Sequence, residues 1–174
     1  RPRPSTCAMA RRRRVNSALM LRSNLREAGR RARFYVLQFD FATLGEKMRI
    51  VGNLPYNISS PILFKMLQHQ THIIDMTFML QQEVGQRIVA TPGSKIYGRL
   101  SVMIQAFFDV AILFDVPNTA FQPAPKVTSS IIYFTPKASK VKEFSHFSLI
   151  VKHAFATRRK TLNNCLKTLI TQQD

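Results

Sequence analysis

Residues 49–60, RIVGNLPYNISS, change within one short stretch from a strand pattern to a turn pattern to a helix start. Residues 49–52 have the composition of the end of a buried strand, and residues 53–56 contain the proline of a rigid turn. Asn, Ser and Pro then follow in an order typical of a capped helix N-terminus. Because open α/β sheets bind ligands beyond the carboxyl ends of their strands, the stretch predicts a site at residues 53–56.

The turn at residues 53–56 carries groups suited to holding a planar amine. An exocyclic amine on a nucleobase or an amide is a poor nucleophile, because its lone pair is delocalised, and an enzyme that alkylates it must place acceptors against its N–H bonds. Asn53 offers a side-chain carbonyl, and Pro55 stiffens the turn so that the Leu54 backbone carbonyl can point outward. Tyr56 offers a flat face for stacking. The alternative is an ordinary strand-to-helix loop, in which Asn53 satisfies local backbone groups and Tyr56 packs.

The patterns around this turn predict a mostly parallel sheet. Strands are expected at residues 34–39, 49–52, 73–80, 110–116 and 128–134, and helices from Ser59 or Ser60 and at 81–90, 98–108, 144–156 and 158–170. The strand–helix–strand order favours right-handed crossovers between parallel strands. The last two strands, joined by the proline-rich loop 117–125, favour an antiparallel pair at one edge. These patterns do not explain Asp75, which lies inside an apolar run.

The charge balance indicates a polyanionic partner. Lys and Arg exceed Asp and Glu by 17 in the 174 residues, and the sequence pI is about 11.0. Nucleic acid and anionic membrane both fit this charge, but no apolar run reaches membrane-spanning length, so we expect a soluble protein. Cys7 and Cys165 are too isolated for a disulfide framework or a zinc site, and His69 and His72 lack a third ligand. No metal site is therefore expected.

The basic residues are concentrated at the start of the chain. Residues 1–33 contain eleven arginines and the single acid Glu27, whereas the rest of the chain has fifteen basic and eight acidic residues. We expect this head to be poorly ordered, with a short helix at residues 16–30. It has the composition of a mitochondrial-type presequence or of a nucleic-acid-binding arm, and a non-native origin is a third interpretation. The sequence does not decide among the three.

Three further features have both a structural and a functional interpretation. Asp40 follows the strand at residues 34–39, where an acid either forms a turn or meets the donors of a ligand. Phe121 is a large aromatic among prolines and small residues, and it either packs onto the core or forms a stacking platform at a pocket rim. Arg158, Arg159 and Lys160 begin a charged helix and are candidates for binding phosphates.

Four segments in order resemble the rRNA adenine dimethyltransferase family, called KsgA in bacteria: NLPYNISSPILF, FMLQQEVGQRIVATPGSKIYGRLSV, FQPAPKVTSSI and AFATRRKTLNNCL. The resemblance runs from about Phe34 to Leu169 and is most similar to the bacterial branch. Members of the family transfer two methyl groups from S-adenosylmethionine to the 6-amino groups of two adjacent adenines in small-subunit rRNA. The resemblance therefore implies a cytoplasmic, monomeric enzyme that acts on small-subunit rRNA or on the immature small ribosomal subunit.

The resemblance also implies roles for single residues. Asn53 and the Leu54 carbonyl resemble the acceptors for the target amine, on a turn held by Pro55. Tyr56 and Phe121 resemble the two aromatics on either side of a flipped adenine. Two more sets complete the implied sites: Asp40, together with Asn53, resembles the cofactor-binding residues, and Arg158, Arg159 and Lys160 resemble the rRNA-binding start of a helix.

The implied fold is an α/β, Rossmann-like class I methyltransferase sheet that is partial. Its N-terminal strands are missing or replaced, since the family's glycine-rich loop and second acid have no counterpart and only Gly29 lies upstream of Phe34. We expect a head at 1–33, the methyltransferase domain at 34–136 and the truncated start of a small helical rRNA-binding domain at 137–174.

Other functions remain open. A catalytically silent rRNA-binding assembly module is favoured by the missing glycine-rich loop. A mitochondrial relative serving transcription is favoured only by the arginine-rich head. A methyltransferase acting on DNA or on a protein glutamine could use a similar turn, but it would not explain the FQPAPKV and RRK segments.

Overall fold

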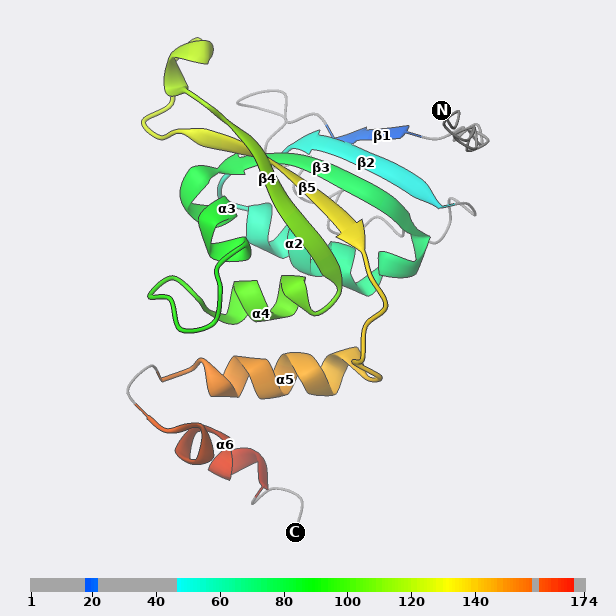
Figure 1. The fold of residues 1–174 in the computed structure, drawn as a ribbon, viewed down its shortest axis with the longest axis vertical. Helices are drawn as coiled ribbons and strands as arrows, with labels where there is room; N and C mark the ends of the chain where they lie inside the picture. Colours follow the sequence, from blue (N-terminus) through cyan, green and yellow to red (C-terminus); the bar gives the residue numbers. More distant parts are fainter. Residues whose placement is uncertain (1–17, 22–46, 158–159, 171–174) are drawn as a thin grey trace, which may run out of the picture.

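Five strands form one sheet in the order β1-β2-β3-β5-β4 (Figure 1). The computed structural model describes residues 18–21, 47–157 and 160–170. The strands are β1 (Ala18–Leu21), β2 (Met48–Asn53), β3 (Ile73–Gln81), β4 (Phe108–Val116) and β5 (Ser129–Pro136). β1, β2 and β3 run parallel, whereas β5 is antiparallel to both β3 and β4. The predicted parallel sheet with an antiparallel pair at one edge is therefore confirmed.

The helices that the structure describes lie on one face of this sheet. They are α2 (Ser59–Gln68), α3 (Gln82–Ile88), α4 (Arg99–Gln105), α5 (Phe144–Ala154) and α6 (Leu162–Ile170), with short 3-10 turns η2 (Gln70–His72) and η3 (Asn118–Ala120). Figure 1 shows α2, α3 and α4 against the sheet, α5 beneath α4, and α6 beneath α5. The sheet and its first helical layer thus form one core, α5 packs on that layer with Val151 buried in the core, and α6 lies beyond α5.

Aromatic and aliphatic side chains fill the space between the sheet and the helices. Phe78, Phe108 and Phe134 come from three adjacent strands, are fully buried, and meet edge to face with ring centroids 5.8 and 6.3 Å apart. Gly85 allows α3 to approach β5 closely, because a Cβ there would lie 2.7 Å from Cδ1 of Ile132. This packing fixes the position of the strand ends that carry the candidate site.

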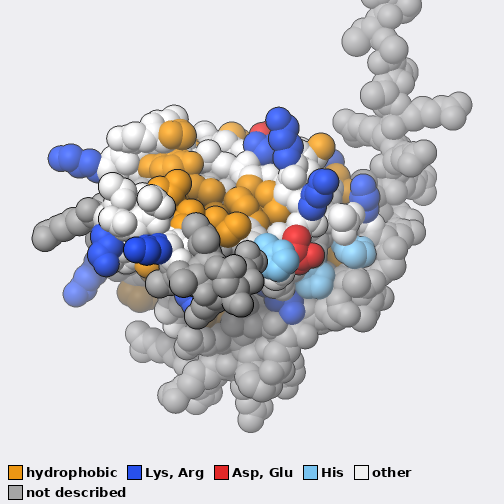
Figure 2. Space-filling view, turned by 90° about the horizontal axis from the view of Figure 1, so that it is seen from below, with side chains coloured by type: hydrophobic (Ala, Val, Ile, Leu, Met, Phe, Trp, Pro, Cys, Tyr) orange, Lys and Arg blue, Asp and Glu red, His pale blue; other side chains and the backbone are white. Residues whose placement is uncertain are grey.

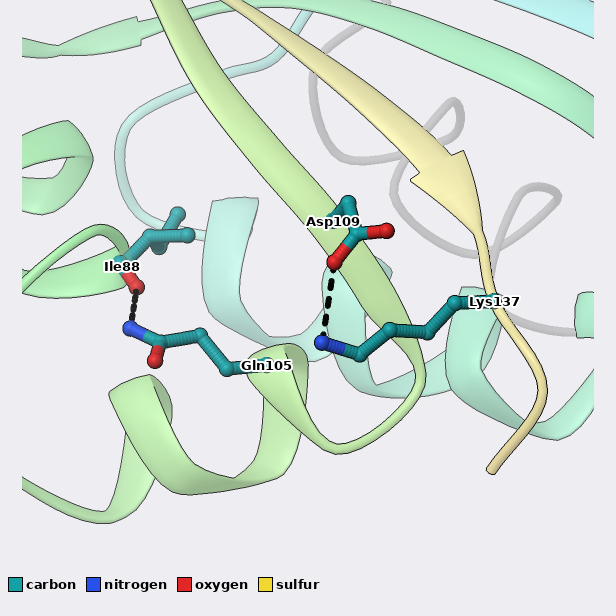
Figure 3. Close-up of polar contacts among 4 residues, drawn as sticks. All are labelled: Ile88, Gln105, Asp109 and Lys137. Atoms are coloured by element: carbon teal, nitrogen blue, oxygen red, sulfur yellow. Dashed lines mark hydrogen bonds and ion pairs between the residues drawn. The ribbon is translucent and has the colours of Figure 1, made fainter. Parts of the chain in front are cut away.

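A hydrogen bond and an ion pair link neighbouring helices and strands. Gln105 donates from Nε2 to the carbonyl of Ile88 at 2.7 Å, which ties α4 to the end of α3 (Figure 3). Lys137 and Asp109 form an ion pair at 2.9 Å between the end of β5 and the start of β4 (Figure 3). The second bond lies at the end of the sheet away from the proline-rich loop.

The structure corrects two expectations about helices. Residues 18–21 form β1, not part of a helix at 16–30, because the free edge of β2 offers a ladder of backbone groups that overrides local propensity. The N-cap of α2 is Ile58, without a side-chain bond, because the Ser59 hydroxyl instead donates to the Tyr56 carbonyl at 3.2 Å. The predicted strand at 34–39 lies outside the described residues.

Two further helix boundaries differ from the prediction. The predicted helix at 98–108 ends at Gln105, because Phe108 already pairs with Pro136 as the first residue of β4. The last helix begins at Leu162, so Lys160 precedes it. Element ends are set by tertiary pairing, which local patterns do not contain.

The face formed by α5 and α6 exposes apolar side chains. Figure 2, seen from this side, shows hydrophobic side chains gathered in the middle of the face with Lys and Arg side chains around them. Leu149, Ile150 and Leu162 are 43%, 48% and 60% exposed. None of the described helices is long and apolar enough to cross a membrane.

Candidate functional site

The turn after β2 follows from a change in backbone pairing. The Leu54 N–H donates to the Met79 carbonyl at 3.2 Å, which continues the parallel ladder one residue beyond β2. Pro55 has no N–H and ends the ladder, and its own carbonyl accepts from Ile58 at 3.1 Å as the chain turns into α2. The turn therefore lies at the carboxyl ends of β2 and β3, where the sequence predicted a site.

This turn and the proline-rich loop form the two sides of an open cleft of about 240 Å³. The residues that line it are Asn53, Leu54, Pro55, Tyr56, Met79, Phe121, Pro123 and Pro125. All five residues predicted to be catalytic are therefore brought together, although Phe121 is distant from the others in sequence.

Local geometry presents Phe121 at the cleft. A 3-10 turn precedes it, with the Phe121 N–H donating to the Asn118 carbonyl at 3.2 Å. The peptide bond between Gln122 and Pro123 is cis. Phe121 is half-buried and lines the cleft, so the structure favours the stacking-platform interpretation over simple core packing.

Two aromatic residues line the cleft. Tyr56 and Phe121 line the same cleft, yet no direct ring contact between them is found among the described aromatic pairs. A cleft with an aromatic ring on each of two walls suits a planar, uncharged ring system.

Asn53 supplies the polar group of the cleft. It is the last residue of β2 and is exposed, and no hydrogen bond of its side-chain amide is found within the part of the chain that the structure describes. A side-chain amide oxygen is an acceptor, the type of group expected for binding an amine.

Sequence patterns missed Ser129. Its hydroxyl lies 3.1 Å from the Tyr56 hydroxyl, and the residue is fully buried at the first position of β5. The available signal was weak: a pair of serines that precedes a β-branched run. Only the pairing of β3 with β5, in which Gln81 lies opposite Ser129, brings it beside the turn.

Other predicted site residues lie away from the cleft or outside the described residues. Asp40, Arg158 and Arg159 fall in the second group. Lys160 is exposed before α6, where its N–H donates to the Thr157 carbonyl at 3.3 Å, and it does not line the cleft.

The histidines and acids of the described residues do not gather into a metal site. No group of three or more His, Cys, Asp or Glu residues that could hold a metal ion is found within residues 18–21, 47–157 and 160–170. His69 and His72 have ring centroids 6.5 Å apart, and His72 Nδ1 lies 3.2 Å from the Thr71 hydroxyl.

The described lining fits a planar base better than it fits S-adenosylmethionine. It offers one amide, aromatic faces and backbone carbonyls, but no carboxylate for a ribose and no glycine-rich backbone. The described residues alone therefore do not fit that cofactor.

Comparison with known proteins gives consistent matches. Residues 32–174 match the family model described as ribosomal RNA adenine dimethylase. The chain is 51% identical over 142 residues to Ribosomal RNA small subunit methyltransferase A of Neisseria meningitidis, covering 80% of this chain and 55% of the relative. The protein of the same name from Aromatoleum aromaticum is 52% identical over 141 residues, covering 79% and 53%. The chain thus spans about half the length of the curated relatives it matches.

Solved structures support the same grouping. A dimethyladenosine transferase from Plasmodium falciparum superposes with a TM-score of 0.64 and 32% identity, covering 68% of this chain and 44% of that one. The 23S rRNA methyltransferase ErmE superposes with a TM-score of 0.56 and 25% identity, covering 71% and 50%. The mixed α/β sheet therefore resembles part of a methyltransferase fold.

Proposed function

Because the chain belongs to the ribosomal RNA adenine dimethylase family, we propose that its cleft holds the target adenine of small-subunit rRNA. The reaction proposed is S-adenosylmethionine-dependent dimethylation of the 6-amino groups of two adjacent adenines. The observation that carries the proposal is the meeting of Asn53 and the turn 53–56 with Phe121 in one cleft.

The residues of the cleft act by positioning. The Asn53 side-chain oxygen and the Leu54 carbonyl accept from the two N–H bonds of the amine, and this directs its lone pair away from the turn. Tyr56 and Phe121 stack on the two faces of the base. Because an adenine inside a helix cannot enter a cleft of this kind, the base is flipped out of its stack first.

The remaining assignments are part of the same proposal. Asp40 completes the cofactor site with Asn53, and Arg158, Arg159 and Lys160 bind rRNA phosphates. Residues 34–136 form the methyltransferase domain, and residues 137–174 belong to a helical rRNA-binding domain. The protein works as a monomer on the immature small subunit in the cytoplasm.

The test is the Asn53→Ala variant. It removes one acceptor, so methylation of an rRNA fragment is expected to be lost, while RNA affinity stays near that of the unsubstituted protein. Asn57→Ala is the matched control, because Asn57 is exposed and does not line the cleft. Retained dimethylation by Asn53→Ala would contradict the proposal.

A second candidate function is a catalytically silent rRNA-binding assembly module. It is favoured by the absence of any acid among the described residues of the cleft. Calorimetric titration with S-adenosylmethionine separates the two functions. Heat that saturates with one site per chain supports the enzyme, and no heat together with retained rRNA binding supports the module.

A further inference from the structure

We infer that Ser129 is a positioning residue that holds Tyr56 as the stacking wall of the cleft, an inference that rests on the proposed function. The two hydroxyl oxygens lie 3.1 Å apart, within hydrogen-bond distance, and either hydroxyl can donate. Ser129 does not line the cleft itself. It acts through Tyr56.

The two partners differ sharply in burial. Ser129 is 0% exposed, whereas Tyr56 is 40% exposed. A fully buried hydroxyl requires a hydrogen-bond partner, and the Tyr56 hydroxyl supplies it. An exposed tyrosine, by contrast, would otherwise exchange rotamers within nanoseconds. The bond therefore constrains the mobile partner and not the buried one.

Ser129 is held firmly enough to serve as an anchor. It pairs with Gln81 at the end of β3, and the residue before it, Thr128, accepts from the Gln82 N–H at 3.0 Å. Tyr56 is fixed at its other end, since its carbonyl accepts from Ser59 at 3.2 Å. The hydroxyl is at the far end of the ring, so anchoring it fixes the direction in which the ring extends.

The same bond sets the relation between the two walls. Tyr56 belongs to the turn between β2 and α2, whereas Ser129 directly follows the loop that carries Phe121. One hydrogen bond thus joins the segment of one aromatic wall to the segment of the other. A preorganised gap binds a flat base without the cost of ordering the wall at each encounter.

A purely structural role for Ser129 predicts different behaviour. If the hydroxyl only satisfied a buried polar group, its removal would lower stability without changing how the cleft holds a base. Ser101 is the matched control, because it is also 0% exposed and its hydroxyl donates to the Arg87 carbonyl at 2.5 Å, away from the cleft.

The experiment uses the full 174-residue chain and an RNA hairpin with two adjacent adenines in its loop. One adenine is replaced by 8-vinyladenine, a fluorescent analogue that keeps the 6-amino group. The fluorescence change at saturating protein reports the equilibrium between stacked and captured base. RNA affinity and thermal melting are measured on the same samples.

Ser129→Ala and Tyr56→Phe are each expected to lower the capture equilibrium by about three- to tenfold, the effect of one hydrogen bond. The double variant should lose no more than either single variant, because both remove the same bond. Ser101→Ala should stay within about twofold of the unsubstituted protein even if its melting temperature falls.

The inference would be overturned if Ser129→Ala captured the base as well as the unsubstituted protein does. It would also be overturned if the effects of the two single substitutions multiplied in the double variant. If Ser129→Ala fails to fold, Tyr56→Phe tests the same bond from its exposed side, and unchanged capture by that variant overturns it equally. Failure of the proposed function gives a different result. In that case the unsubstituted protein and Asn53→Ala would capture the base equally well, or neither would capture it.

Discussion

Gln82 donates from Nε2 to the Asp115 carboxylate at 2.7 Å, and this bond joins the start of α3 to the end of β4. The other oxygen of the same carboxylate accepts from the hydroxyl of Ser130 at 2.5 Å. Just beyond this point β4 ends in the loop that carries Phe121, and the loop leads back into β5. Asp115 therefore fastens the base of that loop to the sheet.

We predict that Asp115→Ala makes the loop at residues 117–128 more mobile. The variant leaves the buried Ser130 hydroxyl without its acceptor, which costs about 1–3 kcal/mol of unfolding free energy. Hydrogen exchange should accelerate at the loop amides more than at those of β2. Asp115→Asn, which keeps one acceptor oxygen, should fall between. Equal acceleration in β2 and the loop would show that the effect is global.

A second prediction concerns Asp75, which is 8% exposed within an apolar strand. Its carboxylate pairs with Arg49 Nε at 3.3 Å and accepts from the Tyr133 hydroxyl at 3.2 Å. Arg49→Ala removes the cation that offsets the cost of burying this carboxylate. The unfolding free energy measured by urea titration should therefore fall by about 1–3 kcal/mol.

The control for Arg49→Ala is Asp109→Ala, which breaks the exposed ion pair with Lys137. Exposed pairs contribute about 0–1 kcal/mol, so this variant should change stability little. If the two variants lose the same free energy, the network of Arg49, Asp75 and Tyr133 contributes no more to stability than an exposed ion pair.

Acidification should loosen the start of α5. Hydrogen bonds from the Ser145 hydroxyl and backbone N–H lower the pKa of the Glu143 carboxyl from its ordinary value. The folded pKa is depressed, so this contribution to stability is present above the unfolded pKa and is lost as the pH falls through the folded pKa. Protection of the first amides of α5, taken relative to the intrinsic exchange rate at each pH, should therefore fall below about pH 4. Glu143→Gln should show no such acid step.

Much of the site could be predicted from the sequence because its signals are local. A proline two residues after a strand end stops the ladder wherever the strand pairs, and a glycine-poor, proline-rich loop can hold an aromatic such as Phe121 in place. The placement of Asn53 at the carboxyl end of β2 follows from these rules, whereas the local pattern left two interpretations of Phe121 and only the family resemblance placed it beside the turn.

The contacts across strands could not be predicted in the same way. Asp75 has no partner nearby in sequence, and Arg49 and Tyr133 reach it only through the register of β2 and β5 against β3. Ser129 reaches Tyr56 for the same reason. A shift of one residue in register would turn each of these side chains to the opposite face, and short apolar strands do not specify their register by composition alone.

The last prediction concerns the charged segment at residues 158–160. If Arg158, Arg159 and Lys160 contact rRNA phosphates, they release bound counterions, and each contact adds about 0.7–0.9 to the slope of log affinity against log salt. The triple alanine variant should therefore weaken rRNA binding at low salt and reduce that slope by about 2–3.

Lys47→Ala is the control for this triple variant, because Lys47 is exposed at the opposite end of β2 from the cleft and should change the slope by less than about 1. The cleft should still capture the base once enough variant is added to saturate the RNA, since the role proposed for these cations is to bind the RNA backbone. An unchanged slope would remove the segment from the interface, whereas a lost base capture at saturation would mean that the segment also orients the RNA toward Tyr56.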